Sequence, residues 1–277
     1  MRLGRRSTNI EDRRGMRMGP AVGGIGGIAV LLIALFLGVD LGALLNSAPE
    51  AVPLSPADSA ALANDPTYDH VARVLRDTEE TWNEIFRANG ADYAEPGTVV
   101  FTDMTSSACG TGQAAMGPFY CQLDRKIYID LGFFEKLRNR FGADGDFAQA
   151  YVIAHEVGHH VQNQLGISER TAAQRQRSGE AESNQLSVMQ ELQADCFAGI
   201  WANNANRSRQ ILEAGDIEEG LNAAAAIGDD RIQRQTQGTV VPESFTHGSS
   251  QQRVRWFRRG IESGDVEACD TFNARAL

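Results

Sequence analysis

Histidine is scarce in this sequence, which holds five among 277 residues. The four cysteines include no C-x-x-C pair, which argues against a zinc site built from cysteines. There is no internal repeat. Taking the six arginines and two acids of residues 1–17 from the totals of 26 and 36 leaves 20 basic and 34 acidic residues. A nucleic-acid-binding domain normally carries a basic surface, so we expect no nucleic-acid partner.

Long apolar runs are also rare, and one stands out. Residues 18–39 carry no charge and follow the basic segment 1–17. As a helix these 22 residues span about 33 Å, enough to cross a bilayer. We therefore expect a single-pass cell-membrane protein with a cytoplasmic N-terminus and an extracytoplasmic remainder, periplasmic in a Gram-negative cell. A cleaved signal peptide is the alternative, although its apolar region is usually shorter.

The remainder reads as a linker followed by one domain. Residues 40–66 are rich in proline and alanine, which is typical of a linker. Residues 67–277 are long enough to bury a substantial core. The 42% hydrophobic and 22% charged composition is that of a folded chain. Most of this region has helical periodicity, so we predict an α+β domain that is predominantly helical with a small β-sheet.

The individual elements follow from the same patterns. Two short β-prone runs, TVVFTD at 98–103 and KIYID at 126–130, predict a small sheet or hairpin. Residues 166–183 are polar and predict a loop or a solvated helix extension. The apolar spacing predicts helices at about 68–90, 131–142, 144–165, 184–205, 216–236 and 249–262.

The cysteines all follow the apolar run, on the side of the membrane where disulfides persist. Four cysteines allow three pairings. Cys109 and Cys121 are close in sequence and bracket a glycine-rich loop. Their proximity favours a Cys109–Cys121 bridge, which leaves Cys196 to pair with Cys269 and tie the C-terminal tail to a central helix.

Three of the five histidines fall in YVIAHEVGHHVQ, residues 151–162. His155, Glu156 and His159 match H-E-x-x-H, a signature of zinc metalloproteases. On a helix, positions four apart lie on one face, so both imidazoles can reach one metal ion. Zinc lowers the pKa of its bound water toward about 7, and Glu156 is then placed to act as general base.

Two histidines leave a catalytic zinc one protein ligand short. The segment ELQADCFAGIWA, residues 191–202, supplies a carboxylate on a predicted helix. Glu191 completes a His/His/Glu set for one Zn²⁺ per chain. Asp195 lies four residues on, and we expect it to accept the N–H of a ligating imidazole and fix its tautomer.

Other side chains are candidates for smaller roles. His160 points about 100° round the helix from His159, so we expect it to pack and not to bind metal. His247 lies in a turn before a helix, where it can stabilise the oxyanion of a tetrahedral intermediate or simply belong to a helix entry capped by Ser249 or Ser250. Tyr151, one turn before His155, is a second oxyanion candidate, although packing is the favoured role at this position.

The sequence resembles the gluzincin metallopeptidases, the class that contains thermolysin, through HEVGH followed by E-x-x-x-D. More closely, it resembles the bacterial neutral zinc metallopeptidases. The motifs that carry this resemblance are ACG…GPFYC (108–121), YID (128–130), AHEVGHHVQNQLG (154–166), ELQADCFAGIWA (191–202), AAAAIGDDRIQ (223–233), FTHGSSQQRVRWFRRG (245–260) and CDTF (269–272). The resemblance implies a zincin-like metallopeptidase domain behind an N-terminal anchor.

By that resemblance, His155, His159 and Glu191 are metal ligands, Glu156 is the general base and Asp195 supports a ligand. We therefore expect a membrane-anchored zinc metallopeptidase that acts on a peptide or protein substrate. A zinc-bound, non-catalytic envelope module that binds a protein partner is the alternative hypothesis. It would require a fourth protein ligand, because structural zinc sites are usually closed by four.

Overall fold

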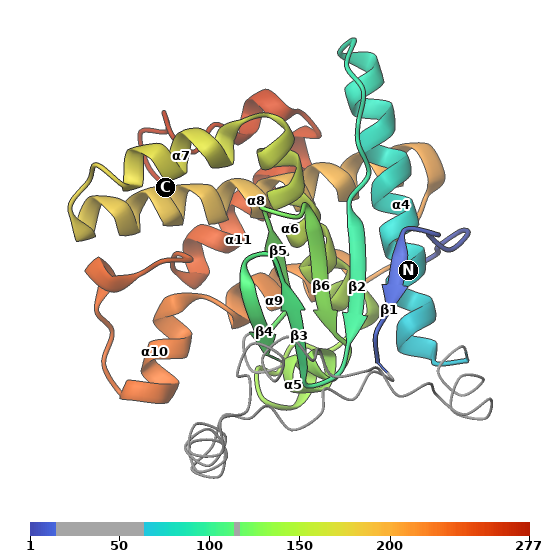
Figure 1. Ribbon diagram of the computed structural model, residues 1–277, viewed down its shortest axis with the longest axis horizontal. Helices are drawn as coiled ribbons and strands as arrows, with labels where there is room; N and C mark the ends of the chain where they lie inside the picture. Colours follow the sequence, from blue (N-terminus) through green and yellow to red (C-terminus); the bar gives the residue numbers. More distant parts are fainter. Residues whose placement is uncertain (15–63, 114–116) are drawn as a thin grey trace, which may run out of the picture.

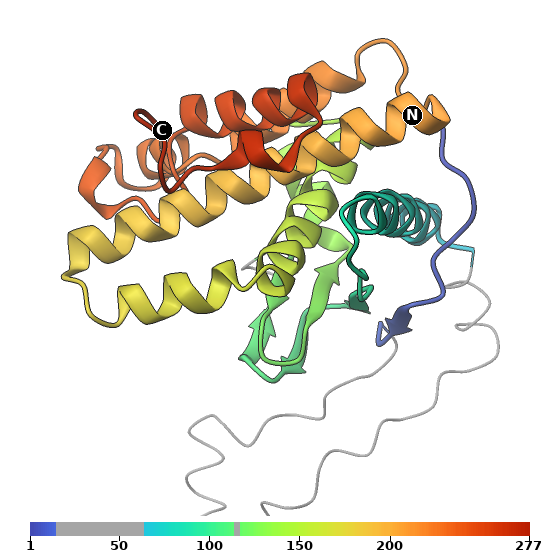
Figure 2. The same cartoon turned by 90° about the horizontal axis from the view of Figure 1, so that it is seen from above.

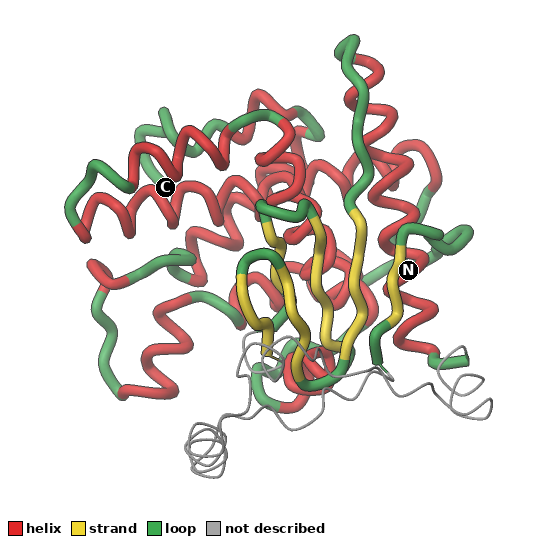
Figure 3. The backbone as a smooth tube through the Cα atoms, in the orientation of Figure 1, coloured by secondary structure: helices red, strands yellow, loops and turns green. Residues whose placement is uncertain are grey.

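The computed structural model describes residues 1–14, 64–113 and 117–277. Figure 3 distinguishes its helices from its strands. The strands are β1 (Ile10–Asp12), β2 (Gly97–Phe101), β3 (Met104–Ser107), β4 (Gly110–Gln113), β5 (Phe119–Cys121) and β6 (Lys126–Asp130). The helices are α4 (Pro66–Ala88), α5 (Gly132–Asn139), α6 (Asp146–Gln164), α7 (Ile167–Arg175), α8 (Glu180–Arg209), α9 (Asp216–Ala226), α10 (Asp229–Gln237) and α11 (Ser250–Ser263), with short 3₁₀ turns η2 (Pro242–Ser244) and η3 (Val266–Cys269). The predicted class, mainly helical α+β, is confirmed.

The elements form layers around α6. Helix α6 packs against β5 and β6 on one side and against α8 and α9 on the other. Figure 2 shows α8 and α11 side by side in the layer beyond α6, with the sheet on the opposite side. Because α6 is enclosed in this way, 14 of its 19 residues are buried. A helix buried on nearly all sides can hold polar groups in fixed positions within an apolar interior.

The main sheet has the strand order β1-β2-β6-β5. The two predicted β-prone runs form β2 and β6, which lie side by side and pair in parallel, so they are not a hairpin. The hairpins arise instead between β3 and β4 and between β5 and β6. Two parallel strands need a connection that brings the chain back to the end of the sheet where the first strand began. The segment that contains β3, β4 and β5 is this connection.

Helices α8 and α11 approach at two glycines. A Cβ on Gly199 would lie 2.2 Å from the carbonyl oxygen of Phe257, and one on Gly260 would lie 2.0 Å from that of Cys196. No other residue leaves room for such backbone contact. The close approach brings the start of α11 beside the middle of α8.

The predicted helices are present with two differences. The expected helix at 216–236 is two helices, because the chain turns at Gly228. A glycine is needed at this turn, since a Cβ there would lie 2.4 Å from the backbone nitrogen of Ser250. The polar stretch 166–183 contains the separate helix α7. Ser249 caps α11 in a capping box with Gln252, as the sequence indicates.

Residues 1–14 belong to the same folded unit as the domain. Strand β1 pairs in parallel with β2, and the backbone N–H of Ser7 donates to the carbonyl of Ala72 on α4. Ser7 and Asn9 also donate to the buried carboxylate of Glu79. The sequence led us to expect a separate cytoplasmic segment at 1–17. In this structure its first 14 residues pack against the domain through β2 and α4.

The predicted anchor at residues 18–39 and most of the predicted linker lie outside the described residues. Within the described ranges, no helix is long and apolar enough to cross a bilayer.

Both expected disulfides are formed. Cys109 bonds to Cys121, and Cys196 on α8 bonds to Cys269 in η3, with Cα–Cα distances of 5.8 and 5.7 Å. Such distances are usual for disulfides. The second bridge ties the C-terminal tail to α8 one residue after Asp195.

Candidate metal centre

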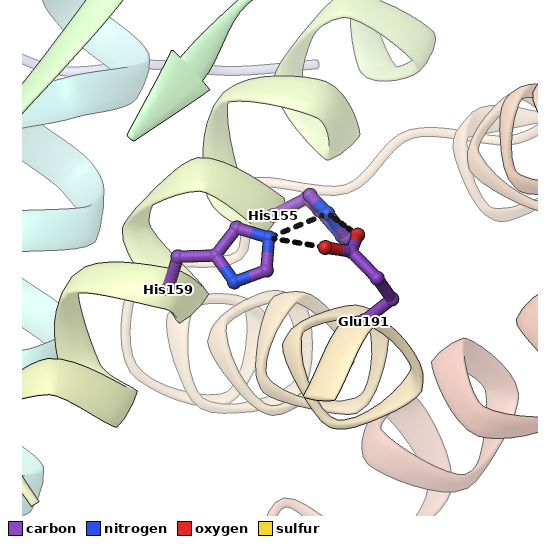
Figure 4. Close-up of side chains that lie close together, drawn as sticks. All are labelled: His155, His159 and Glu191. Carbon is purple, nitrogen blue, oxygen red and sulfur yellow. Dashed lines mark hydrogen bonds and ion pairs between the residues drawn. The ribbon is translucent and has the colours of Figure 1, made fainter. Parts of the chain in front are cut away.

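His155, His159 and Glu191 point toward one another from two helices (Figure 4). The histidines lie one turn apart on α6, and Glu191 faces them from α8. The Nε2 atoms of the two histidines are 3.1 Å apart. The carboxylate oxygens of Glu191 lie 3.1 Å from Nε2 of His155 and 3.4 Å from Nε2 of His159. The sequence predicted all three residues, and the fold brings them together.

These separations suit a zinc ion. Donor atoms about 2.0–2.1 Å from a tetrahedral zinc lie about 3.3 Å from one another. The two Nε2 atoms are 3.1 Å apart, and each lies 3.1 or 3.4 Å from the nearer of the two Glu191 oxygens. Two imidazoles and one carboxylate are also the donor set that zinc takes in catalytic sites with a fourth, open position. The residues present therefore fit zinc.

Asp195 orients His155 from behind. Its Oδ1 lies 2.8 Å from Nδ1 of His155, and Asp195 is fully buried. Burial alone raises the pKa of Asp195, but the charges of Arg253 and His155 outweigh it and hold the pKa at about 2. An ionised carboxylate can only accept, so Nδ1 carries a proton and Nε2 faces Glu191 and His159. The predicted role of Asp195 matches this geometry.

His159 is oriented by a residue that the motif did not indicate. Its Nδ1 lies 2.9 Å from Oε1 of Gln162, one turn further along α6. The amide nitrogen of Gln162 donates to the carbonyl of Gln190 at 2.7 Å, which turns the amide oxygen toward His159. Gln162 is fully buried. The only available signal in the sequence was its three-residue spacing from His159.

Tyr151 lies on the Nδ1 side of His155, where both side chains contact Oδ1 of Asp195. It is fully buried, and its hydroxyl donates to Oδ1 of Asp195. Arg253, also buried, contacts both Asp195 and Tyr151. The sequence offered Tyr151 as an oxyanion donor, but burial leaves it with a supporting role. His160 packs as expected, with its ring between Tyr120 and the carbonyl of Ala94.

Glu156 follows His155 on α6 and is largely buried. Burial lowers the pKa of His159, but nearby charges outweigh burial and raise it, Glu191 most of all. The charge of Glu156 raises the same pKa by a smaller amount. The general-base candidate therefore lies close to the metal ligands, in largely buried surroundings.

His247 approaches the site from the loop before α11. Its Nδ1 lies 3.2 Å from Oδ1 of Asp229. This hydrogen bond raises the pKa of His247 against the opposing effect of burial, and the charge of Glu191 raises it further. The side chain of His247 is 54% exposed, so its ring is open to solvent.

Asp229 organises this loop. Its Oδ2 accepts the backbone N–H groups of Thr246, His247 and Gly248 at 2.8, 2.6 and 3.1 Å. Asp229 thus fixes both the backbone and the ring of His247.

Comparison with known proteins agrees with this geometry. The family model described as "Putative neutral zinc metallopeptidase" matches residues 1–272. The chain belongs to this family. Zinc is accordingly the metal that the family implies, and peptide-bond hydrolysis is the class of reaction. The match includes residues 1–14, which the structure packs onto the domain.

The chain is also similar to proteins from distant bacteria. It is 48% identical to "Uncharacterized protein YpfJ" of Escherichia coli K12, over 97% of this chain and 96% of that protein. It is 40% identical to "Uncharacterized protein Rv2575" of Mycobacterium tuberculosis H37Rv, over 88% of this chain and 86% of that one. No solved structure matches. These relatives match most of this chain and indicate no substrate.

Proposed function

We propose that this protein is a zinc-dependent peptidase that hydrolyses peptide bonds with Glu156 as general base. The observation that carries the proposal is the convergence of His155, His159 and Glu191 at the mutual distances of a zinc ligand set. Among the described residues, this His-containing cluster has three protein ligands. A catalytic zinc keeps its fourth position for water, whereas a structural zinc usually has four protein ligands.

The chain's own groups perform the proton transfers. Zinc held here supplies Lewis acidity and a water of lowered pKa. Glu156 accepts a proton from the attacking water and returns it to the leaving amine nitrogen, so one carboxylate serves both steps. A positioned general base of this kind contributes about 10²–10⁴-fold to the rate.

His247 is proposed to donate a hydrogen bond to the oxygen of the scissile carbonyl. The Asp229 contact favours the protonated imidazole, which is the better donor as negative charge develops. The ring is held from behind through Nδ1, so Nε2 is left for the substrate. A donor of this type contributes about 10²–10³-fold to the rate.

We further propose that residues 18–39 attach the protein to a membrane and that the domain is extracytoplasmic. The two disulfides support an oxidising compartment, because such bonds persist there and are rare in a reducing cytosol. For β1 to stay paired with β2, residues 1–14 must lie on the same side of the membrane as the domain, so residues 18–39 would enter the membrane without crossing it from one side to the other.

The test uses the full chain and measures zinc and hydrolysis separately. We expect one zinc per chain in the wild type, lost or greatly weakened in Glu191→Ala and unchanged in Glu182→Ala, an exposed acid of the same helix. Glu156→Gln should retain zinc and lose cleavage of a fluorescent casein or peptide library. Full hydrolysis by Glu156→Gln would refute the mechanism. A wild type that binds zinc through four protein ligands and cleaves nothing in the library would favour the non-catalytic module.

A further inference from the structure

Arg253 is a buried cation directly behind the candidate metal ligands. It lies in the first turns of α11 and is 2% exposed. Its Nε donates to Oδ2 of Asp195 at 2.9 Å, and its Nη2 donates to Oδ1 at 2.8 Å. This is the paired geometry that a guanidinium makes with a carboxylate, and a lysine cannot reproduce it.

Further contacts fix the plane of the guanidinium. Nη2 lies 3.2 Å from the hydroxyl of Tyr151, and Nη1 donates to the carbonyl of Ile227 at 3.3 Å. Arg253 is therefore held by groups from α6, α8 and the end of α9. With both oxygens of Asp195 engaged, the carboxylate cannot rotate, and its Oδ1 stays on Nδ1 of His155 at 2.8 Å.

We propose that Arg253 is a positioning residue for the metal ligand His155, acting through Asp195. It fixes the direction from which Asp195 accepts the Nδ1 proton, and thus the plane in which the imidazole presents Nε2. Its charge also balances that of Asp195, which leaves His155 beside a neutral pair and not beside an isolated buried anion. Groups that orient a ligating histidine typically affect metal affinity by about 10–100-fold.

A second pair in the same molecule is a matched control. Arg209 donates from Nε to Oδ2 of Asp77 at 2.8 Å and from Nη2 to Oδ1 at 3.0 Å. Asp77 is buried like Asp195. It contacts Trp201 and none of the metal ligands, so the Arg209–Asp77 pair joins α4 to α8 with the same chemistry and without a histidine. The Arg209 side chain is more exposed than that of Arg253, so the comparison rests on zinc affinity, which a general effect of breaking an ion pair should not change at the Arg209 site.

The experiment compares Arg253→Lys, Arg209→Lys and the double substitution Asp195→Asn with Arg253→Gln in the full chain. The double substitution removes both charges together, which avoids leaving one buried and unpaired. Zinc affinity is measured by competition with a chromophoric chelator, and the ligand geometry by visible absorption of the Co²⁺-loaded protein. Neither readout depends on peptidase activity.

We expect Arg253→Lys to raise the dissociation constant for zinc by about 10–100-fold and to alter the Co²⁺ spectrum. Arg209→Lys should lower the melting temperature and leave zinc affinity within about twofold of wild type. If Arg253→Lys does not fold, the neutral double variant is read in its place: wild-type zinc affinity there overturns the proposal, and a loss assigns the effect to the Arg253–Asp195 pair as a unit. Wild-type affinity and spectrum in the Arg253 variants would overturn the proposal, as would an equal loss of affinity in Arg209→Lys.

This inference rests on the proposed zinc site but not on the proposed hydrolysis. If the wild type binds zinc and cleaves nothing, the peptidase proposal fails, while the comparison of Arg253 with Arg209 still gives its answer. If the wild type hydrolyses peptides and Arg253→Lys binds zinc normally, the positioning proposal alone fails.

Discussion

Gly158 and Ala194 form a very close contact between α6 and α8. A Cβ on Gly158 would lie 2.9 Å from the carbonyl oxygen of Ala194 and 3.1 Å from its Cα. Gly158 lies between the two histidine ligands, and Ala194 lies between Glu191 and Asp195. The separation between the ligands on the two helices is therefore set by the absence of one methyl group.

Gly158→Ala should push the two helices apart at the metal site. Overpacking a close contact typically costs about 1–3 kcal/mol, and here it also moves Glu191 away from the histidines. We expect a lower melting temperature and weaker zinc binding, measured by calorimetry and chelator competition. Gly4→Ala, where a Cβ would meet nothing within 4 Å, is the control. Normal zinc affinity in Gly158→Ala would show that the contact does not set the ligand geometry.

The two disulfides should differ in their contributions to stability. Cys196–Cys269 closes a separation of 73 residues, and Cys109–Cys121 closes one of 12. In the chain-entropy model these bridges stabilise by about 4 and about 3 kcal/mol. Replacing Cys196 and Cys269 together with serine should lower the melting temperature more than the same change at the other pair. Equal effects would indicate that chain entropy does not dominate.

Zinc binding should release protons at neutral pH. Burial lowers the pKa of His155, but Asp195 and Glu191 outweigh it and raise the pKa to about 10 without metal. The metal-free His155 is thus protonated at pH 7.5. Its raised pKa stabilises the fold fully below the unfolded pKa of about 6.5, and this stabilisation is lost as the pH rises toward 10. Because zinc requires a free Nε2, titration calorimetry in two buffers of different ionisation enthalpy should detect release of about one proton. Asp195→Asn should reduce that release.

The pH dependence of hydrolysis should report the Asp229–His247 pair. The hydrogen bond to Asp229 raises the pKa of His247, against burial. If the protonated ring stabilises the oxyanion, kcat/KM should fall as pH rises through that pKa. Asp229→Asn should move the fall to lower pH, whereas His247→Gln should remove it and lower kcat by about 10²–10³-fold with zinc retained. A profile unchanged in both variants would exclude His247 from the reaction.

Residues 1–14 and the domain should occupy one compartment. Single cysteines introduced at the exposed positions Thr8 and Ser263 can be tested with a membrane-impermeant maleimide on intact cells. Since β1 pairs with β2, we expect both positions to be labelled or both to be protected. Labelling at position 263 alone would show that β1 is not paired in the membrane-attached protein.

The ligand set was predictable because helix geometry fixes it locally. His155 and His159 share a face at a spacing of four, and Glu191 and Asp195 repeat that spacing on α8. The disulfide pairing followed from the closeness of Cys109 to Cys121 in the sequence. Within each helix, and for Cys109–Cys121, the distance in space follows from a short distance along the chain, whereas the meeting of Glu191 with the histidines and the Cys196–Cys269 bridge join distant segments.

The rest of the site depends on contacts between distant segments. Arg253 reaches Asp195 from 58 residues away, and Asp229 reaches His247 across 18. No local pattern identifies such partners, and Arg253 was one arginine among several in the helix that became α11. Strand β1 was missed for a related reason: its partner β2 lies beyond residues 15–63, and three residues carry too little periodicity to predict a strand.

Arg14 and Asp65 are joined by an ion pair of 2.7 Å between Nη1 and Oδ2. The two ends of the chain that flank residues 15–63 thus lie within reach of one arginine and one aspartate side chain of each other. For protein engineering, the closeness of these two ends means that they can be joined by a short linker when residues 15–63 are removed. A glycine-serine linker of a few residues between positions 14 and 64 can replace it, since closing so short a gap costs little chain entropy. Such a chain retains β1 and the metal site together, whereas a truncation that simply starts at residue 64 discards one strand of the sheet.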